Sequence, residues 1–440
     1  PGQRLPATAR QAARRTHLLN PGAWKGAATH PVPMSEARII PITPRATPRP
    51  ATGGQWESRL TASPPLALYV HFPWCVKKCP YCDFNSHGVR DEGIPEAAYI
   101  EALIADLEGA LPQVWGRRVH SIFIGGGTPS LMSPDGLDTL LTAIRMRVML
   151  DPMAEITLEA NPGTVDAGRF LAFRQAGVNR LSVGIQSFNE GHLQALGRIH
   201  GRADAIAAAE AALTHFEAVN LDLMYALPGQ SLAEAEADLA MAIALAPQHL
   251  SCYHLTLEPN TAFAANPPTI PDPDASADMQ DLVEARLAGA GYGHYETSAF
   301  ARPNRECRHN LNYWTFGDYL GIGAGAHGKL SSHEGIVRET RPRHPSAYLA
   351  ARESGTFVQE RRTIESAELP FEFMMNALRL NQGFPRRLFA ERTGLPFEAA
   401  EAGLLKATRQ GLIETNGESL RPTTQGRHFL NELLMLFLPG

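Results

Sequence analysis

Three of the five cysteines in this chain of 440 residues stand within one short segment, YVHFPWCVKKCPYCDF. Cys75, Cys79 and Cys82 are separated by three and then two residues, and they follow directly after a predicted strand. Thiolates are the usual protein ligands of iron–sulfur clusters, and a four-iron cluster held by only three of them keeps one iron open to a further ligand. The spacing therefore predicts a [4Fe–4S] site with an open coordination position.

A zinc site is the alternative interpretation of these cysteines, with His71 or His87 as the fourth ligand. All three cysteines lie in a single loop, which does not provide the paired knuckles usual for structural zinc, so the cluster is favoured. Their clustering also differs from a disulfide framework, which spreads its cysteines to close long loops. We therefore expect a reducing, cytoplasmic setting.

The overall composition narrows the function further. A formal charge of −5 and an isoelectric point near 6.4 give no electrostatic case for a nucleic-acid partner. No apolar run reaches the length of a transmembrane helix, and the apolar stretch 430–438 is far too short, so we expect no transmembrane segment. No compact apolar segment precedes a cleavage site near the N-terminus, so we expect no signal peptide.

Residues 1–62 differ in composition from the rest. The first sixty residues carry nine Lys and Arg against two acidic residues, Glu36 and Glu57, with many Pro and Ala and no lasting periodicity. We expect a disordered extension, which includes the possibility of translated sequence upstream of a start at Met34. An organelle transit peptide is the alternative, because such leaders are rich in Arg and poor in acidic residues.

From residue 63 to about 300, short apolar runs alternate with amphipathic stretches. The predicted strands are 66–72, 121–126, 155–161, 180–186, 219–227 and 249–257, and helices are predicted at 96–111, 133–148, 203–216 and 231–246. Six βα units in succession imply a parallel sheet with right-handed crossovers. We therefore predict a partial (β/α)6 barrel, with a flat doubly wound sheet as the competing α/β arrangement.

The alternation stops after residue 300. Residues 301–364 are predicted to form a strand-and-loop extension beside the barrel, and residues 365–440 a mostly helical, winged-helix-like domain. Asn416–Gly417 stands between two strand-like runs and predicts a hairpin. This last segment carries eight Lys and Arg against nine Asp and Glu, so a packing or lid role is favoured over DNA binding.

The three-cysteine spacing, with Tyr81 before the last cysteine, resembles the radical-SAM superfamily. From about Leu66 to the C-terminus the chain is similar to oxygen-independent coproporphyrinogen III oxidase-like proteins. The matching motifs are GGGTPS (125–130), LEANP (158–162), RLSVGIQSF (180–188), LGRIHGR (196–202) and DLMYALPGQ (222–230). Two details favour the heme-chaperone branch, the HemW-type proteins: Phe84 stands where the oxidase has a fourth cysteine, and residues 309–314 match an HNxxYW motif.

This resemblance implies a radical-SAM barrel that binds a [4Fe–4S] cluster, S-adenosylmethionine and heme, and that delivers heme to acceptor proteins such as membrane respiratory oxidases. An electron donor such as flavodoxin or ferredoxin is the further implied partner. The alternative function is that of a coproporphyrinogen III dehydrogenase in porphyrin biosynthesis, an enzyme that oxidatively decarboxylates two propionates of its substrate.

The resemblance also implies a set of contacts to S-adenosylmethionine. The matching positions are Tyr69, Tyr81, Gly126, Gly127, Thr128, Glu159, Gln186, Arg198 and Asp222. Several of them follow predicted strands, where ligands of such barrels gather. Considered without the family, the run from Gly125 to Gly127 is equally a tight strand-to-helix turn, Arg198 a solvated helix residue and Asp222 a partner of buried backbone.

His309 of the HNxxYW motif is the predicted heme ligand, because imidazole is a common axial donor. Cys307 and Cys252 are the alternatives. A third interpretation assigns His309, Asn310, Tyr313 and Trp314 to a hydrogen-bonded structural cluster at the barrel edge.

Overall fold

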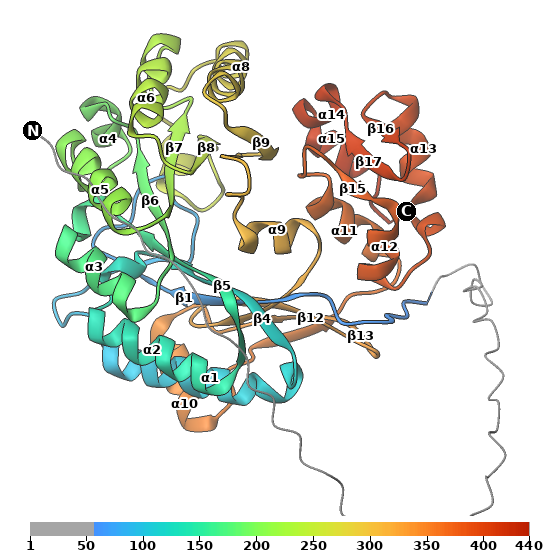
Figure 1. Cartoon of the computed structure of the whole chain (residues 1–440), viewed down its shortest axis with the longest axis horizontal. Helices are drawn as coiled ribbons and strands as arrows, with labels where there is room; N and C mark the ends of the chain where they lie inside the picture. Colours follow the sequence, from blue (N-terminus) through green and yellow to red (C-terminus); the bar gives the residue numbers. More distant parts are fainter. Residues whose placement is uncertain (1–56, 440) are drawn as a thin grey trace, which may run out of the picture. The chain divides into compact units, whose positions relative to one another are not determined.

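The computed structural model describes residues 57–439, and its main element is a continuous twelve-stranded sheet. Six parallel strands form the middle of this sheet and lie side by side in chain order (Figure 1). They are β1 (Leu66–Phe72), β4 (Arg118–Gly126), β5 (Met149–Ala160), β6 (Arg180–Gln186), β7 (Ala218–Tyr225) and β8 (His249–His254). A doubly wound sheet reverses its order midway, whereas a barrel adds each new strand on the same side. The predicted partial barrel is therefore confirmed and the doubly wound alternative is excluded.

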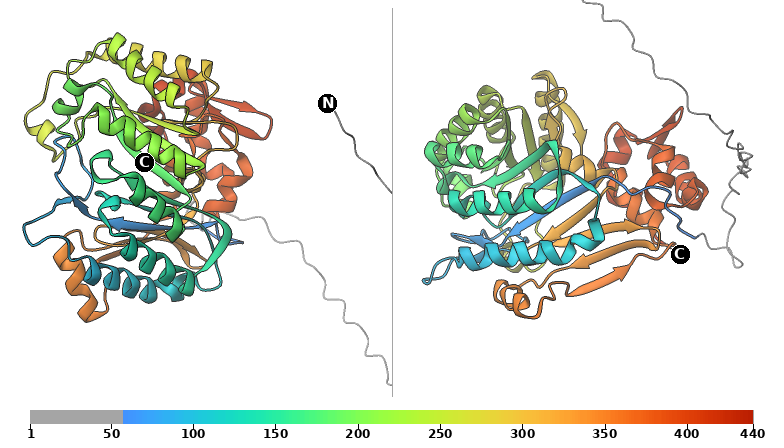
Figure 2. Two further views of the ribbon diagram at one scale, coloured as in Figure 1. Left: turned by 60° about the vertical axis from the view of Figure 1, so that its left-hand side comes forward. Right: turned by 60° about the horizontal axis from the view of Figure 1, so that its bottom comes forward.

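Helices join successive strands and cover the outer face of the sheet (Figures 1 and 2). They are α1 (Glu96–Val114), α2 (Pro134–Arg147), α3 (Ala167–Ala176), the short α4 (Glu190–Ala195), α5 (Arg202–His215) and α6 (Leu232–Leu245). The side chains of Ser133, Asp166 and Ser231 accept hydrogen bonds from backbone N–H groups in the first turns of α2, α3 and α6. These caps fix where the predicted helices begin.

Side chains alternate along each strand between the apolar core and the interior of the barrel. In β1, Leu68 and Val70 are at most 1 % exposed and join the apolar cluster that packs against the outer helices. The neighbouring Tyr69 stacks instead on Phe123 of β4, with ring centroids 6.3 Å apart. Since successive side chains of a strand point to opposite faces, the interior of the barrel is lined by polar and aromatic groups while aliphatic groups hold the helices.

The sheet continues beyond both edges of the barrel. Next to β1 lie β11 (Asp318–Ile322), β12 (His327–Ser332), β13 (Gly335–Thr340) and β14 (Glu360–Thr363), and next to β8 lie β10 (Ala299–Ala301) and β9 (Gly293–Glu296). β11 pairs with β1 in parallel, with Leu66 opposite Asp318, and the later strands add antiparallel. The segment predicted as an extension beside the barrel is thus part of the same sheet. The pairing of β11 with β1 is a contact across about 250 residues, which local patterns do not reveal.

Four further helices accompany these strands: α7 (Ala262–Ala265), α8 (Pro273–Gly289), α9 (Arg308–Trp314) and α10 (Pro345–Ser354). α9 crosses the inner side and contacts β1, β4 and β11. The carboxylate of Glu155 accepts the backbone N–H groups of Arg308 and His309, each at 3.2 Å, so an acidic group holds the first turn of this helix.

The C-terminal part is mostly helical around a small sheet, as predicted. Its elements are α11 (Leu369–Ala377), β15 (Phe384–Pro385), α12 (Arg386–Thr393), α13 (Glu401–Arg409), β16 (Ile413–Asn416), β17 (Ser419–Pro422), α14 (Thr424–His428) and α15 (Leu430–Met435). The predicted hairpin is present: Asn416 pairs with Ser419, and Gly417 takes the positive φ of 59° that the turn requires. Phe373 and Phe389 lie in a second apolar cluster, which also includes Phe316 from the segment before β11.

The predicted extension lies outside the described residues as far as position 56, and so do Met34 and the alternatives attached to it. Its last residues contact the C-terminal part: Ser58 Oγ donates to the carbonyl of Thr393 at 2.6 Å, and Arg59 N–H donates to that of Gly394 at 3.1 Å. Structured chain therefore begins before residue 63. Between residues 57 and 439, none of the helices combines the length and the apolar character needed to cross a bilayer.

Candidate functional site

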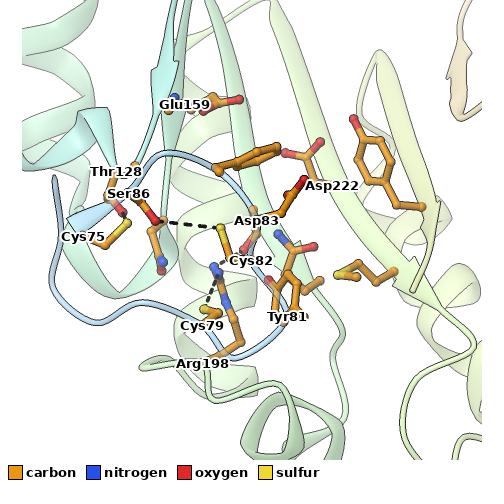
Figure 3. A pocket seen from close by; sticks show the side chains of 18 of the residues that line it. Cys75, Cys79, Tyr81, Cys82, Asp83, Ser86, Thr128, Glu159, Arg198 and Asp222 are labelled. Carbon is orange, nitrogen blue, oxygen red and sulfur yellow. Dashed lines mark hydrogen bonds between the residues drawn. The ribbon is translucent and has the colours of Figure 1, made fainter. Parts of the chain in front are cut away.

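The three predicted cysteines lie on one loop at the carboxyl end of β1. β2 (Trp74–Cys75) pairs with β3 (His87–Gly88), and the backbone N–H of Val89 donates to the carbonyl of Cys75 at 2.9 Å. This pairing closes the loop that carries Cys79 and Cys82. All three thiols line a single cavity of about 320 Å³, which we call the cysteine cavity (Figure 3).

Each sulfur has a different hydrogen-bond partner. Thr128 Oγ1 donates to Cys75 Sγ at 3.4 Å, and Cys82 Sγ lies 3.9 Å from Ser86 Oγ (Figure 3). Cys79 Sγ accepts from Arg198 Nη1 at 3.7 Å. Hydrogen bonds to thiolate sulfur are one of the means by which proteins adjust iron–sulfur clusters, so the donor set fits such a group.

Burial raises the pKa of the Cys75 and Cys82 thiols. A bound metal provides the positive charge that holds such groups as thiolates. Neither His71 nor His87, the two candidates for a fourth zinc ligand, lines the cysteine cavity. His71 Nε2 pairs with the carbonyl of Asn85 at 2.8 Å, and the ring of His87 packs against that of His344, with centroids 5.2 Å apart. The three thiols thus line this cavity without either imidazole proposed from the sequence; the histidine that lines it is His254.

The glycine run after β4 lies against the cysteine loop. The backbone N–H of Gly127 donates to the carbonyl of Phe72, and that of Thr128 to the carbonyl of Trp74, each at 2.7 Å. A Cβ on Gly127 would stand 2.5 Å from the Trp74 carbonyl oxygen. The close approach that these glycines permit is therefore first of all an approach to the backbone of the cysteine loop.

Two acidic side chains, from β5 and β7 on either side of β6, line the cavity. Glu159 Oε2 accepts the backbone N–H of Gly126 at 3.1 Å, while Asp222 accepts from Ser182 Oγ at 3.0 Å and from Asn220 Nδ2 at 2.8 Å. Burial and the charge of Asp222 raise the pKa of Glu159 to about 7. Carboxyl groups of this kind accept hydrogen bonds from hydroxyl and ammonium groups.

Gln186 and Arg198 also belong to the predicted set and line the same cavity. Gln186 ends β6 with a φ of 69°, a left-handed conformation that non-glycine residues rarely adopt and that clusters at functional sites. Arg198 Nη2 donates to the carbonyl of Gly184 at 2.8 Å, and its buried Nε has no hydrogen-bond partner among the described residues. Arg198 is therefore fixed between β6 and Cys79 and is not a solvated helix residue.

The structure gathers most of the predicted residues around the cysteine cavity. Those lining it are Cys75, Cys79, Tyr81, Cys82, Gly126, Gly127, Thr128, Glu159, Gln186, Arg198 and Asp222. Tyr69 is not among them, because its ring faces a second cavity of about 620 Å³ that adjoins the first. The Tyr69 hydroxyl pairs there with His71 Nδ1 at 3.0 Å.

His309 lies away from the cysteines, in the first turn of α9. It is 2 % exposed, Nδ1 pairs with Ser121 Oγ at 3.0 Å, and the ring stacks on that of Phe123 with centroids 5.0 Å apart. Burial and the charge of Arg180 lower its pKa to about 3. Its Nε2 has no hydrogen-bond partner within residues 57–439, and the ring does not line either cavity. Its assignment as a heme ligand stays a prediction.

Several lining residues were not anticipated from the motifs. They include Lys77, Asp83, Phe84 and Ser86 of the cysteine loop, Asn161 after β5, and Tyr253, His254, Leu255 and Thr256 around the end of β8. A signal for the last group was present, because the carboxyl end of every barrel strand is a candidate ligand position. Asp83 and Phe84 line both cavities, a position that the sequence alone does not indicate.

Comparisons with known proteins agree with this geometry. The model of the radical SAM superfamily matches residues 69–242, and that of the HemN C-terminal domain matches residues 364–429. The solved structure of coproporphyrinogen III oxidase (HemN) from Escherichia coli, described as a radical SAM enzyme, superposes with a TM-score of 0.73 at 23 % identity. That match covers 85 % of this chain and 90 % of the other, so the two share a fold.

Relatives of higher sequence identity show which family within this superfamily the chain belongs to. The chain is 49 % identical to the heme chaperone HemW of Escherichia coli, over 85 % of its own length and 98 % of the relative. It is 38 % identical to the heme chaperone HemW of Mycobacterium tuberculosis, over 82 % and 92 %, respectively. It is also 36 % identical to the mouse mitochondrial radical S-adenosyl methionine domain-containing protein 1, over 89 % and 91 %. The resemblance inferred from the motifs is confirmed, and the chain belongs to the heme chaperone HemW family of the radical SAM superfamily.

Proposed function

We propose that this protein is a heme chaperone that carries a [4Fe–4S] cluster on Cys75, Cys79 and Cys82, binds S-adenosylmethionine beside it, and delivers heme to acceptor proteins. The observation that supports this most directly is the convergence of three thiols and the carboxylates Glu159 and Asp222 on one cavity, with a second cavity adjoining it. The relatives named as heme chaperones support the assignment of heme as the molecule that is carried.

Each side of the cysteine cavity has a part in this proposal. Arg198 and Thr128 donate hydrogen bonds to cysteine sulfurs and thereby hold the loop in place. Glu159 and Asp222 accept the hydroxyl or ammonium groups of S-adenosylmethionine, and the backbone of Gly126 and Gly127 adjoins the same space. One-electron chemistry on S-adenosylmethionine is what a cluster of this class supplies when bound.

The partners follow from the same proposal. A cluster that cycles between redox states takes electrons from a small donor such as flavodoxin or ferredoxin, and the heme passes to acceptors such as membrane respiratory oxidases. A cytoplasmic location suits a set of reduced thiols. His309 is the heme ligand that the HNxxYW motif predicts.

The test is anaerobic reconstitution of the full chain with iron and sulfide, followed by parallel assays of heme binding, heme transfer to an apo-acceptor and turnover of coproporphyrinogen III. We expect bound iron and sulfide, stoichiometric heme binding and transfer, and no protoporphyrinogen. Efficient formation of protoporphyrinogen would contradict the chaperone function. One zinc per chain without iron would contradict the cluster.

A further inference from the structure

The second cavity has the dimensions and the lining of a site for a flat aromatic molecule. Its volume of about 620 Å³ lies within the ~300–1,000 Å³ usual for small-molecule sites. Five aromatic rings line it: Tyr69, Phe84, Phe123, Tyr313 and Tyr319. They come from β1, the cysteine loop, β4, α9 and β11, so three adjacent strands on the β1 side of the barrel contribute. Rings of this kind bury large areas of an aromatic ligand and stack on its face or edge.

The cavity borders the cysteine cavity directly. Asp83, Phe84, Gly126 and Glu159 line both. Asn85 fastens the far wall to the cysteine loop, because its Nδ2 donates to the carbonyls of Ala324 at 2.9 Å and Arg343 at 2.8 Å. The second cavity is therefore part of the same functional region, and a ligand in it would lie against residues that also line the cysteine cavity.

One imidazole on the wall of this cavity is free to bind a metal. His327 is the first residue of β12, lines the cavity and is exposed, and its ring has no hydrogen-bond partner in the part of the chain that the structure describes. Burial and the nearby charges of Arg338 and Arg343 lower its pKa, while the carboxylate of Glu360 opposes them. A lowered pKa favours the neutral imidazole, which is the form that ligates iron.

The other histidines near this cavity are less suited to the same role. Both ring nitrogens of His71 are engaged, with the Tyr69 hydroxyl and with the carbonyl of Asn85. His309 lies beneath Phe123, is almost fully buried and does not reach the lining. Ring nitrogens without a hydrogen-bond partner distinguish His327 from His71, which also lines the cavity, and access to the cavity distinguishes it from His309.

A cation stands on the same wall. Arg343 lines the cavity, is exposed and forms no ion pair with any carboxylate within residues 57–439. The neighbouring Arg341 also lines the cavity, but it is held by Asp106 at 2.9 Å and Glu339 at 3.0 Å. Arg343 is therefore the guanidinium available to a carboxylate of the ligand, a pairing for which arginine has suitable geometry.

We propose that heme lodges in this second cavity, that His327 supplies an axial ligand to the iron and that Arg343 pairs with a heme propionate. The proposal rests on the heme-binding function proposed above and assigns a location and ligand that the HNxxYW motif does not. It places the heme against the residues shared with the cysteine cavity. No covalent or redox step is required, since coordination of an imidazole nitrogen to iron and an ion pair account for the binding.

The experiment is a titration of the purified full-length protein with hemin, with absorbance and electron paramagnetic resonance used to record affinity and axial ligation. We expect His327→Ala to bind heme at least about ten-fold more weakly and to change the ligand-field spectrum, because losing even an outer partner of a metal ligand typically costs ~10–100-fold in metal affinity. We expect His327→Cys to give the spectrum of a thiolate-ligated heme, a result that a merely structural role would not produce. Arg343→Gln should weaken binding about ten-fold without altering the spectrum.

Matched controls come from the same region. His333 stands in the turn between β12 and β13 with its side chain 87 % exposed, and Arg352 lies exposed on α10, so His333→Ala and Arg352→Gln should bind heme as the wild type does. Circular dichroism confirms that each variant is folded. A wild-type spectrum in both His327 variants, with a changed spectrum in His309→Ala, would overturn the ligand assignment and leave heme binding intact. Failure of the wild type itself to bind heme would instead overturn the proposed function.

Discussion

The two cavities share a wall but differ in the chemistry of their lining. Three thiols distinguish the cysteine cavity, which also has carboxyl groups and one guanidinium, whereas the second cavity has no thiol and is lined by five aromatic rings, two guanidinium groups and an imidazole without a hydrogen-bond partner among the described residues. The first is built almost entirely at the carboxyl ends of barrel strands. The second needs α9, β11, β12 and β13, which the barrel itself does not provide. Under the proposed function, the barrel would supply the cofactor site and the added strands the space for heme.

The largest effect is expected from removing one cysteine. Cys79→Ser takes away one of only three thiolate ligands, so the reconstituted protein should fall from about four irons per chain to well below one. Heme binding should persist, because Cys79 does not line the second cavity. Iron and sulfide analysis together with a hemin titration checks both points. Cys252→Ala, which changes a buried thiol of β8 outside both cavities, is the matched control and should keep its iron. If Cys79→Ser lost heme binding along with its iron, the heme and the cluster would not occupy separate sites.

A smaller effect, on stability, is expected from replacing Asp106, which holds the cavity-lining Arg341 in place. Asp106 of α1 holds Arg341 at 2.9 Å and accepts the Tyr348 hydroxyl at 2.9 Å, and the Asp106 and Arg341 side chains are each 1 % exposed. Asp106→Ala leaves a buried guanidinium without one of its partners and should lower the free energy of unfolding by about 3–5 kcal/mol. Urea denaturation measures the change.

Glu101 of the same helix provides the control. It pairs with Arg352 at the surface, where both side chains are about half exposed, so Glu101→Ala should cost less than about 1 kcal/mol. Equal losses of unfolding free energy in the two variants would mean that the buried contacts of Asp106 contribute no more to stability than a surface ion pair.

The carboxyl group shared by both cavities should make stability depend on pH. The folded protein raises the pKa of Glu159 from 4.5 to about 7, so it binds this proton more tightly than the unfolded chain does. The resulting stabilisation is complete below about pH 4.5 and is lost as the pH rises through 7. Between pH 5 and pH 8 the wild type should lose about 1–3 kcal/mol more than Glu159→Gln, as urea denaturation at the two pH values measures.

The exposed Glu353 of α10 serves for comparison, and Glu353→Gln should follow the pH dependence of the wild type. Parallel stability curves for Glu159→Gln and the wild type would contradict a buried, protonated Glu159. Such a result would mean that Glu159 is ionised in the folded protein and that a charged carboxylate stands between the two cavities.

How far the sequence predicts the molecule differs between the two cavities for a physical reason. Periodicity located the six barrel strands, and the residues that follow them, such as Glu159 and Gln186, line the cysteine cavity. Local patterns suffice there because each βα unit is continuous in the chain. The second cavity joins residues as distant as Tyr69 and Gln359, and its wall depends on the parallel pairing of β11 with β1.

His309 illustrates the same limit at the level of one residue. The motif that contains it is recognisable in sequence, but His309 on α9 pairs with Ser121 and stacks on Phe123, both of β4 and nearly 190 residues earlier in the chain. Likewise, the contact of Arg198 with Cys79 unites a residue after α4 with the loop after β1. Contacts of this kind are set by the folded sheet and not by the spacing of residues along the chain.

The smallest effect is expected from Phe84, which lines both cavities and is 60 % exposed. Because it is so exposed, Phe84→Ala should change the free energy of unfolding by less than about 0.5 kcal/mol. It should also leave the iron content unchanged. Loss of one aromatic contact, worth about 0.5–1.5 kcal/mol, should nevertheless weaken heme binding by a factor of about 2–10, which a hemin titration resolves. Val76, exposed on the same loop but lining neither cavity, is the control, and Val76→Ala should bind heme normally. If Phe84→Ala lost iron and kept its heme affinity, the ring would belong to the cysteine cavity alone, and the boundary between cofactor and cargo would lie on the other side of it.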